Sequence, residues 1–197
     1  MPIRLFGLCF CVVMVGCQPP VEPATVTVTP KVPVAAPSPS PLAPTAKAGQ
    51  TRVANQENPS RLYQLKDLKQ TPVTVGTHKF PLWVMDTDSK RQEGMMFLVD
   101  KEVKPNEGMI FLFKDPQPND GARGFWMRNC SLGLDIIYVS ASKKVLNIGD
   151  GVPYNEKPVV PAGAFQYVVE LKRGMGRKMG IKPGDAVQWD KNVVSQD

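Results

Sequence analysis

The side chains best suited to chemistry gather at one bend of the chain, between two apolar segments. Trp126 offers a flat apolar face, Arg128 carries a fork of hydrogen-bond donors, and Asn129 both donates and accepts. Asp135, an acceptor, follows in the next apolar segment. Bends at strand ends often lie at the mouth of a pocket, so this set predicts recognition of a polyhydroxylated or anionic small molecule. A structural alternative is an ion pair between Arg128 and Asp135, with Asn129 bonded to the backbone of the bend.

Glu170 is the second candidate, because it interrupts a segment otherwise made of valine and leucine. Burying an unpaired carboxylate is costly, so this side chain must face solvent, a cation or a cavity. Arg91 and Arg128 are available as guanidinium partners. If Glu170 and Asp135 faced one space, they could also act as a general acid and base, which makes a hydrolase an alternative function.

Cys130 and His78 give little support for a nucleophile or a metal site. They are the only cysteine and histidine in the predicted folded part, and a pair of this kind would rest on their presence alone. We therefore expect Cys130 to be a buried, inert residue without a disulfide partner. One histidine and one cysteine cannot make a zinc site, and no run of carboxylates resembles a calcium loop, so no metal and no cofactor are expected.

The first residues predict export. Arg4 precedes an apolar run over 5–15, and Gly16 precedes Cys17, which is the order of a secretory signal peptide over residues 1–16. The segment resembles a bacterial lipoprotein signal, which implies that Cys17 is acylated, with palmitate among its chains, and anchors the protein in a membrane. Gln18 after the cysteine implies the periplasmic face of the outer membrane in a Gram-negative cell. The alternative is an ordinary secreted protein in which Cys17 lies near the cleavage site by chance.

Composition divides the rest of the chain into a spacer and one domain. Residues 17–60 are rich in proline, alanine and threonine and hold no aromatic residue, so they predict a disordered, semi-stiff linker. A proline-rich recognition segment is the alternative. Residues 61–197 are long enough for one domain. The net charge of +6 is spread along the chain, and this, together with export, argues against a nucleic-acid partner.

Short strands between glycine and proline turns predict a mainly β domain, a small antiparallel barrel or sandwich with one or two short helices. A hairpin is expected over 71–84, a helix over 85–96, and a loop over 114–123. Further strands are expected over 108–113, 124–127, 134–139, 143–148, 165–171 and 186–189.

Several ordered motifs bring a family resemblance into view. They are KRQEGMM at 90–96, GM at 108–109, WMRN at 126–129, LDI at 134–136, YVVEL at 167–171, and GI and GD at 180–181 and 184–185. Together they resemble the domain of unknown function 192 over 72–189, which implies a compact, mainly β, often exported domain. The positions that the resemblance singles out are Arg91, Trp126, Arg128, Asn129, Asp135, Glu170, Gly184 and Asp185. Two departures are Arg128-Asn129-Cys130 in place of Lys-Asn-Thr, and Gly133 in place of proline.

These observations lead to one functional hypothesis and two alternatives. The hypothesis is an envelope-tethered binding module that recognises a polar small molecule or glycan. Its expected binding residues are Arg91, Trp126, Arg128, Asn129, Asp135 and Glu170. The alternatives are the hydrolase and a structural or assembly factor that binds another envelope protein. The sequence leaves the oligomeric state open.

Overall fold

The computed structural model describes residues 57–120 and 123–197, so the predicted signal peptide and most of the predicted linker lie outside the described residues. These described residues form seven strands with short helical segments between them. In order, the elements are η1 (Leu65–Asp67), β1 (Gln70–Val75), β2 (His78–Met85), α1 (Asp88–Glu93), η2 (Asp100–Glu102), β3 (Gly108–Gln117), β4 (Leu134–Val139), β5 (Val145–Gly151), β6 (Phe165–Lys172), α2 (Met175–Lys178) and β7 (Val187–Gln188).

The seven strands form one sheet in the order β5-β4-β6-β3-β2-β1-β7. Neighbouring strands run antiparallel except β2 and β3, which are parallel with Leu82 opposite Gly108. A parallel pair needs a crossover connection, and the segment that holds α1 and η2 provides it. The mainly β fold is confirmed, with this one parallel pair as an addition to the expected antiparallel pattern.

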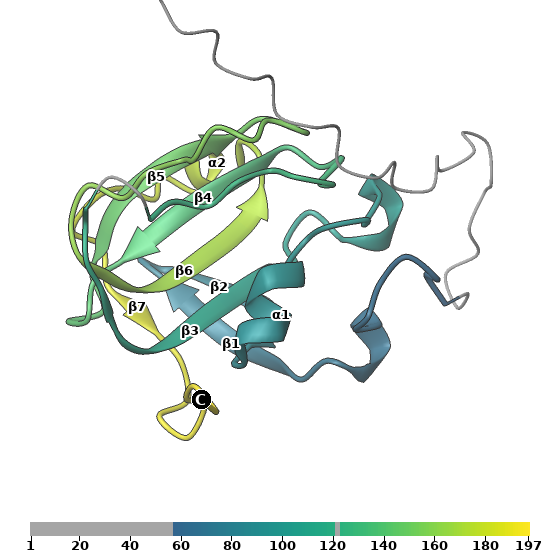
Figure 1. Ribbon diagram of the computed structural model, residues 1–197. Coiled ribbons are helices and arrows are strands. Elements are labelled where there is room, and N and C mark those ends of the chain that lie inside the picture. The colour runs from purple at the N-terminus through teal and green to yellow at the C-terminus, as the bar shows by residue number, and fades with distance from the viewer. Residues whose placement is uncertain (1–56, 121–122) are drawn as a thin grey trace, which may run out of the picture. The chain divides into compact units, whose positions relative to one another are not determined.

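The sheet curls until its two ends meet. A bridge joins Lys144, just before β5, to Ala186, just before β7. Val187 donates its N–H to the carbonyl of Lys143 at 2.9 Å, and Gly184 donates to the carbonyl of Val145 at 2.8 Å. Figure 1 shows the resulting curved sheet, with β7 beside β1 and α1 packed near β2 and β3.

Each face of the sheet has its own apolar cluster, because side chains alternate between faces along a strand. On β6, Val169 and Leu171 belong to the cluster that the curled sheet surrounds, together with Ile110 and Ile137. Val168 belongs to the cluster on the opposite face, which α1 and its neighbouring loops help to cover. Glu170 shares the face of Val168 by this alternation, and the candidate site lies on that face.

Several element boundaries differ from the sequence prediction. The helix expected over 85–96 is shorter and consists only of α1. Thr87 caps its start by accepting the N–H of Lys90, and Gly94, with a φ of 45°, ends it. β3 runs on to Gln117, into the expected loop. The expected strand over 124–127 is reduced to one bridge between Phe125 and Val159. Among the described residues, no helix has the length and apolar character needed to cross a membrane.

A candidate ligand pocket over the central strand

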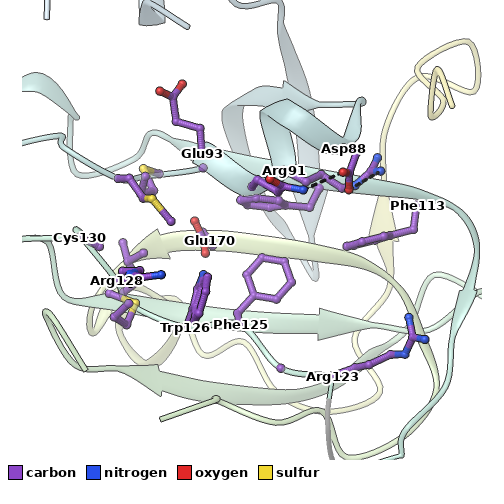
Figure 2. Close-up of a pocket in the computed structure, with 18 of the residues that line it drawn as sticks. Asp88, Arg91, Glu93, Phe113, Arg123, Phe125, Trp126, Arg128, Cys130 and Glu170 are labelled. Atoms are coloured by element: carbon purple, nitrogen blue, oxygen red, sulfur yellow. Dashed lines mark hydrogen bonds and ion pairs between the residues drawn. The ribbon is translucent and has the colours of Figure 1, made fainter. Parts of the chain in front are cut away.

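A cavity of about 250 Å³ opens between α1, the segment 94–96 and the segment 123–130, over strands β3 and β6. Its wall includes five aromatic residues, which come from elements far apart in the sequence (Figure 2). The aromatic residues are Phe111, Phe113, Phe125, Trp126 and Phe165. Trp126 is the most accessible of them, with 49% of its surface exposed, so it forms part of the pocket mouth.

Glu170 is the buried polar group of this pocket. It lies on β6, opposite Met109 of β3 and Ile136 of β4, and only 4% of its surface is exposed. Its Oε2 atom has no hydrogen-bond partner. Burial raises the pKa of the Glu170 carboxyl group to about 8, because the charged form loses its hydration. The carboxyl group is therefore mostly protonated at neutral pH.

Arg61 fixes the wall formed by residues 94–96. Its buried guanidinium donates to the carbonyls of Gly94 and Met96 and forms an ion pair with Glu93 at 3.3 Å. The Glu93 carboxylate also accepts the backbone N–H of Leu62 and of Tyr63. The segment before β1 is thereby held against the end of α1, and Asn58, also buried, shows that packing begins just before the predicted domain boundary at residue 61.

Arg91 lines the pocket from α1, but its charge already has partners. It forms ion pairs with Asp197 and Asp88, and its Nη1 donates to the carbonyl of Leu112 at 2.8 Å. Its guanidinium also lies 4.8 Å from the centre of the Phe113 ring. Its Nε is buried and lacks a hydrogen-bond partner.

Arg128 and Arg123 lie at the opposite side of the pocket and are also paired. The guanidinium of Arg128 is 3.6 Å from the carboxylate of Glu156 and 5.4 Å from the centre of the Trp126 ring. Arg123 lies 3.3 Å from the carboxylate of Asp120. The expected pair of Arg128 with Asp135 does not form.

Asp135 does not belong to the pocket. It is paired in register with Leu171, one residue beyond Glu170, so the two carboxyl groups point to opposite faces of the sheet. Its carboxylate accepts the N–H groups of Gly174 and Gly176, at 3.0 and 2.7 Å, and so fixes the start of α2. The prediction that Asp135 and Glu170 act together as an acid–base pair is wrong for this reason.

Asn129 and the turn at Gly184 and Asp185 also lie outside the pocket lining. Asn129 has a positive φ of 54°, and its carbonyl accepts the N–H of Phe97 at 2.8 Å, so it shapes the bend through its backbone. Asp185 accepts the N–H of Lys182 at 2.9 Å within its own turn. Of the six expected binding residues, the structure brings together Arg91, Trp126, Arg128 and Glu170 around one cavity.

Cys130 lines the pocket as a buried thiol that donates weakly to the carbonyl of Leu132. Burial raises the pKa of the Cys130 thiol to about 12, with a smaller contribution from Glu170, so the thiolate is not populated near neutral pH. Within the described residues, no group of three or more His, Cys, Asp or Glu side chains is placed to hold a metal ion.

The pocket residues that the sequence analysis missed are the phenylalanines. Phe111 and Phe113 share the face of Met109, which stands opposite Glu170. The strand over 108–113 was expected to be buried on both faces, without assigning its residues to one face or the other. Assigning alternate residues to opposite faces would have placed the rings of Phe111 and Phe113 on the face of Glu170. Phe125 and Phe165 meet them only through the tertiary fold, with Phe125 4.9 Å from Phe111 between ring centres.

Comparisons with known proteins identify relatives of the domain. The model of the family DUF192, described as "Uncharacterized ACR, COG1430", matches residues 71–189. A protein of unknown function from Novosphingobium aromaticivorans DSM 12444 is similar in structure, with a TM-score of 0.58 and 38% identity over 72% of this chain and 100% of that chain. A proposed transcription regulator from Sinorhizobium meliloti 1021 has a TM-score of 0.56 and 26% identity over 62% of this chain and 95% of that chain. No curated protein matches the sequence significantly.

Proposed function

Because this chain belongs to the DUF192 family, whose description assigns no activity, we propose its function from the pocket itself: the domain binds a small molecule that joins a polar group to an apolar or ring-shaped body. One observation carries the proposal. Among the described residues, the buried side-chain N and O atoms without a hydrogen-bond partner are Glu170 Oε2 and Arg91 Nε, and both residues line the same cavity. Buried polar groups are normally satisfied, so a ligand is expected to supply the missing partners.

The aromatic wall supports the same proposal. The lining combines aromatic rings with polar and charged side chains. In small-molecule sites, polar groups among apolar walls fix the orientation of the ligand. Trp126 at the mouth offers a flat ring on which a sugar or another ring could stack. These features support a polar small molecule or a glycan unit as the proposed ligand.

Binding to the full chain can be tested by thermal shift with a panel of monosaccharides, amino sugars, amines and carboxylic acids. We expect at least one class to raise Tm, because a ligand that binds only the native state stabilises it. Trp126→Ala is expected to weaken that ligand about tenfold. Leu62→Ala is the control, since Leu62 is exposed and does not line the pocket.

Two results would contradict the binding module. One is a panel that leaves Tm unchanged in the wild-type protein. The other is a ligand whose affinity is the same in the wild type, Trp126→Ala and Glu170→Gln. Recovery of a defined envelope protein with the chain, in the absence of any small-molecule ligand, would favour the assembly factor instead.

We further propose that Cys17 is acylated and tethers the domain to the periplasmic side of the outer membrane. The support is the order of charged, apolar and small residues before Cys17, which lies outside the described residues. Metabolic labelling with palmitate should mark the wild-type chain and leave Cys17→Ser unlabelled. Equal labelling of both chains, or none of the wild type, would contradict the anchor.

A further inference from the structure

We propose that the ligand of this pocket carries a positively charged amine, which pairs with the carboxyl group of Glu170. This inference rests on the binding function proposed above and names the class of ligand. It follows from which charges at the pocket already have partners, from the rings around Glu170, and from the space beside it.

The arginines of the pocket leave no unpaired positive charge for an anionic ligand. Arg91 is paired with Asp197 and Asp88, and the Asp197 pair is bidentate, with both Nη atoms donating to its two carboxylate oxygens. The hydrogen bonds from Arg91 hold the pKa of Asp197 at about 2, so this carboxylate stays charged at neutral pH. An anionic ligand would have to displace a carboxylate that is already in place.

The other arginines near the pocket are also paired with carboxylates. Arg128 has Glu156, and Arg123 has Asp120. Arg61, behind the wall, has Glu93. Each positive charge at the pocket therefore has a negative partner in the described structure, whereas the carboxyl group of Glu170 has no ion pair and no hydrogen bond at Oε2.

The surroundings of Glu170 suit a cation with an apolar body. In Figure 2 the carboxyl group lies in the space between α1 and the rings of Phe125 and Trp126. Ring faces attract cations, and two rings of this pocket already do so within the protein, since Arg91 lies over Phe113 and Arg128 over Trp126. An amine at Glu170 would form an ion pair with the carboxylate and would also contact the faces of neighbouring rings.

Arg91 Nε defines a second point of contact. It is a buried donor whose charge is already balanced, so its missing partner is a neutral acceptor such as a hydroxyl or carbonyl oxygen. An amine with such an oxygen in the same molecule, as in amino alcohols and amino sugars, matches both unsatisfied atoms.

Binding of an amine should release a proton. Glu170 is mostly protonated without a ligand, and pairing with an ammonium group favours its ionised form, so its proton passes to solvent. The titratable groups around it do not compete near neutral pH. Burial raises the pKa of both Cys130 and Tyr138, which keeps them neutral, and Arg61 and Arg91 are paired with Glu93 and Asp197.

Isothermal titration of the full chain with phenethylamine, phenethyl alcohol and hydrocinnamate tests the inference, because the three probes share a ring and differ in charge. We expect phenethylamine to bind at least about tenfold more tightly than the other two at pH 8. Its affinity should rise close to tenfold per pH unit up to about pH 8 and then level off, with about one proton released at neutral pH. The alcohol should show no such rise.

Two variants make the test specific. Glu170→Gln should remove the pH dependence of amine binding and the preference for the amine, so that the amine binds no more tightly than the alcohol. Glu57→Gln, the same change at an exposed carboxylate whose partner Lys66 does not line the pocket, should leave both unchanged. Phe125→Leu keeps an apolar wall and should weaken the amine more than the alcohol.

The outcomes separate this inference from the binding function. If the alcohol or hydrocinnamate binds at least as tightly as the amine, with an affinity that Trp126→Ala lowers, the pocket binds ligands but the amine assignment is wrong. An amine affinity that is unaffected by Glu170→Gln also overturns the assignment. Failure of all three probes contradicts the amine assignment, and an additional failure of the wider panel contradicts the binding function.

Discussion

Replacing Glu170 by glutamine should change how the stability of the protein depends on pH. Burial raises the pKa of this carboxyl group in the folded state from an ordinary value of 4.5 to about 8. The native state therefore holds a proton that the unfolded state releases between these two values. Below about pH 4.5 both states are protonated and the burial has no ionisation cost. As the pH rises to about 8, the free energy of unfolding falls.

The size of the effect follows from that interval. At about 1.4 kcal/mol per pH unit, the wild-type protein should lose about 5 kcal/mol from this group between pH 4.5 and 8, and the loss should level off above pH 8. Glutamine stays neutral throughout, so Glu170→Gln lacks this loss. Between pH 4.5 and 7, the free energy of unfolding of the variant should therefore rise by about 3 kcal/mol relative to that of the wild type.

Urea denaturation of the full chain at a series of pH values measures the difference between the two proteins. Taking the difference removes the contribution of the other titrating groups, which both proteins share. Glu156→Gln is the matched control, because Glu156 is exposed and its pair with Arg128 is worth less than about 1 kcal/mol. If the wild-type and Glu170→Gln curves stay parallel from pH 4.5 to 8, the carboxyl group is not a buried neutral acid and the reasoning fails.

Three further predictions concern the scaffold and the thiol. Asp135→Asn should lower the free energy of unfolding by about 1–3 kcal/mol in denaturation curves, because its carboxylate accepts two backbone N–H groups, whereas Asp150→Asn at an exposed ion pair should cost under about 1 kcal/mol; equal losses would contradict the assigned role. Gly108→Ala should cost about 3 kcal/mol or more, since its Cβ would lie 2.1 Å from the carbonyl oxygen of residue 170, while Gly163→Ala, whose nearest neighbour is 3.9 Å away, should leave Tm nearly unchanged. Cys130 should resist iodoacetamide in the native protein near pH 8 and react in urea, as followed by mass spectrometry of its tryptic peptide; rapid native labelling would show that the thiol is neither buried nor of high pKa.

The sequence predicted most strands because apolar alternation and turn residues are local signals. The hairpin of β1 and β2 and the strands β4 and β6 lie within a residue or two of their expected places. The cost of burying a carboxylate was enough to single out Glu170. The parallel pairing of β2 with β3 could not be predicted, because no local pattern specifies which strands become neighbours.

The position of Asp135 was predicted wrongly for a similar reason, since no local pattern specifies how neighbouring strands align. Its distance from Glu170 depends on the register between β4 and β6, and a shift of one residue would have put both on one face. Asn129 was chosen for its polar side chain at a bend, but its backbone, with a positive φ, is what shapes that bend. Arg61 stood at the edge of the expected linker, and its importance became visible only through its contacts with Gly94 and Met96.

The ion pair of Arg61 with Glu93, and the hydrogen bonds around it, would have a mechanical consequence if the domain is held at its amino-terminal side. Force applied to the chain ahead of Asn58 would first load the hydrogen bond from Asn58 to the carbonyl of Phe97. It would then load the hydrogen bonds of Arg61, which hold the turn at Gly94. That turn forms one side of the cavity. If the proposed anchor places the chain under tension, a pull would therefore reach the wall of the cavity through Asn58 and Arg61 and would weaken binding of the proposed ligand.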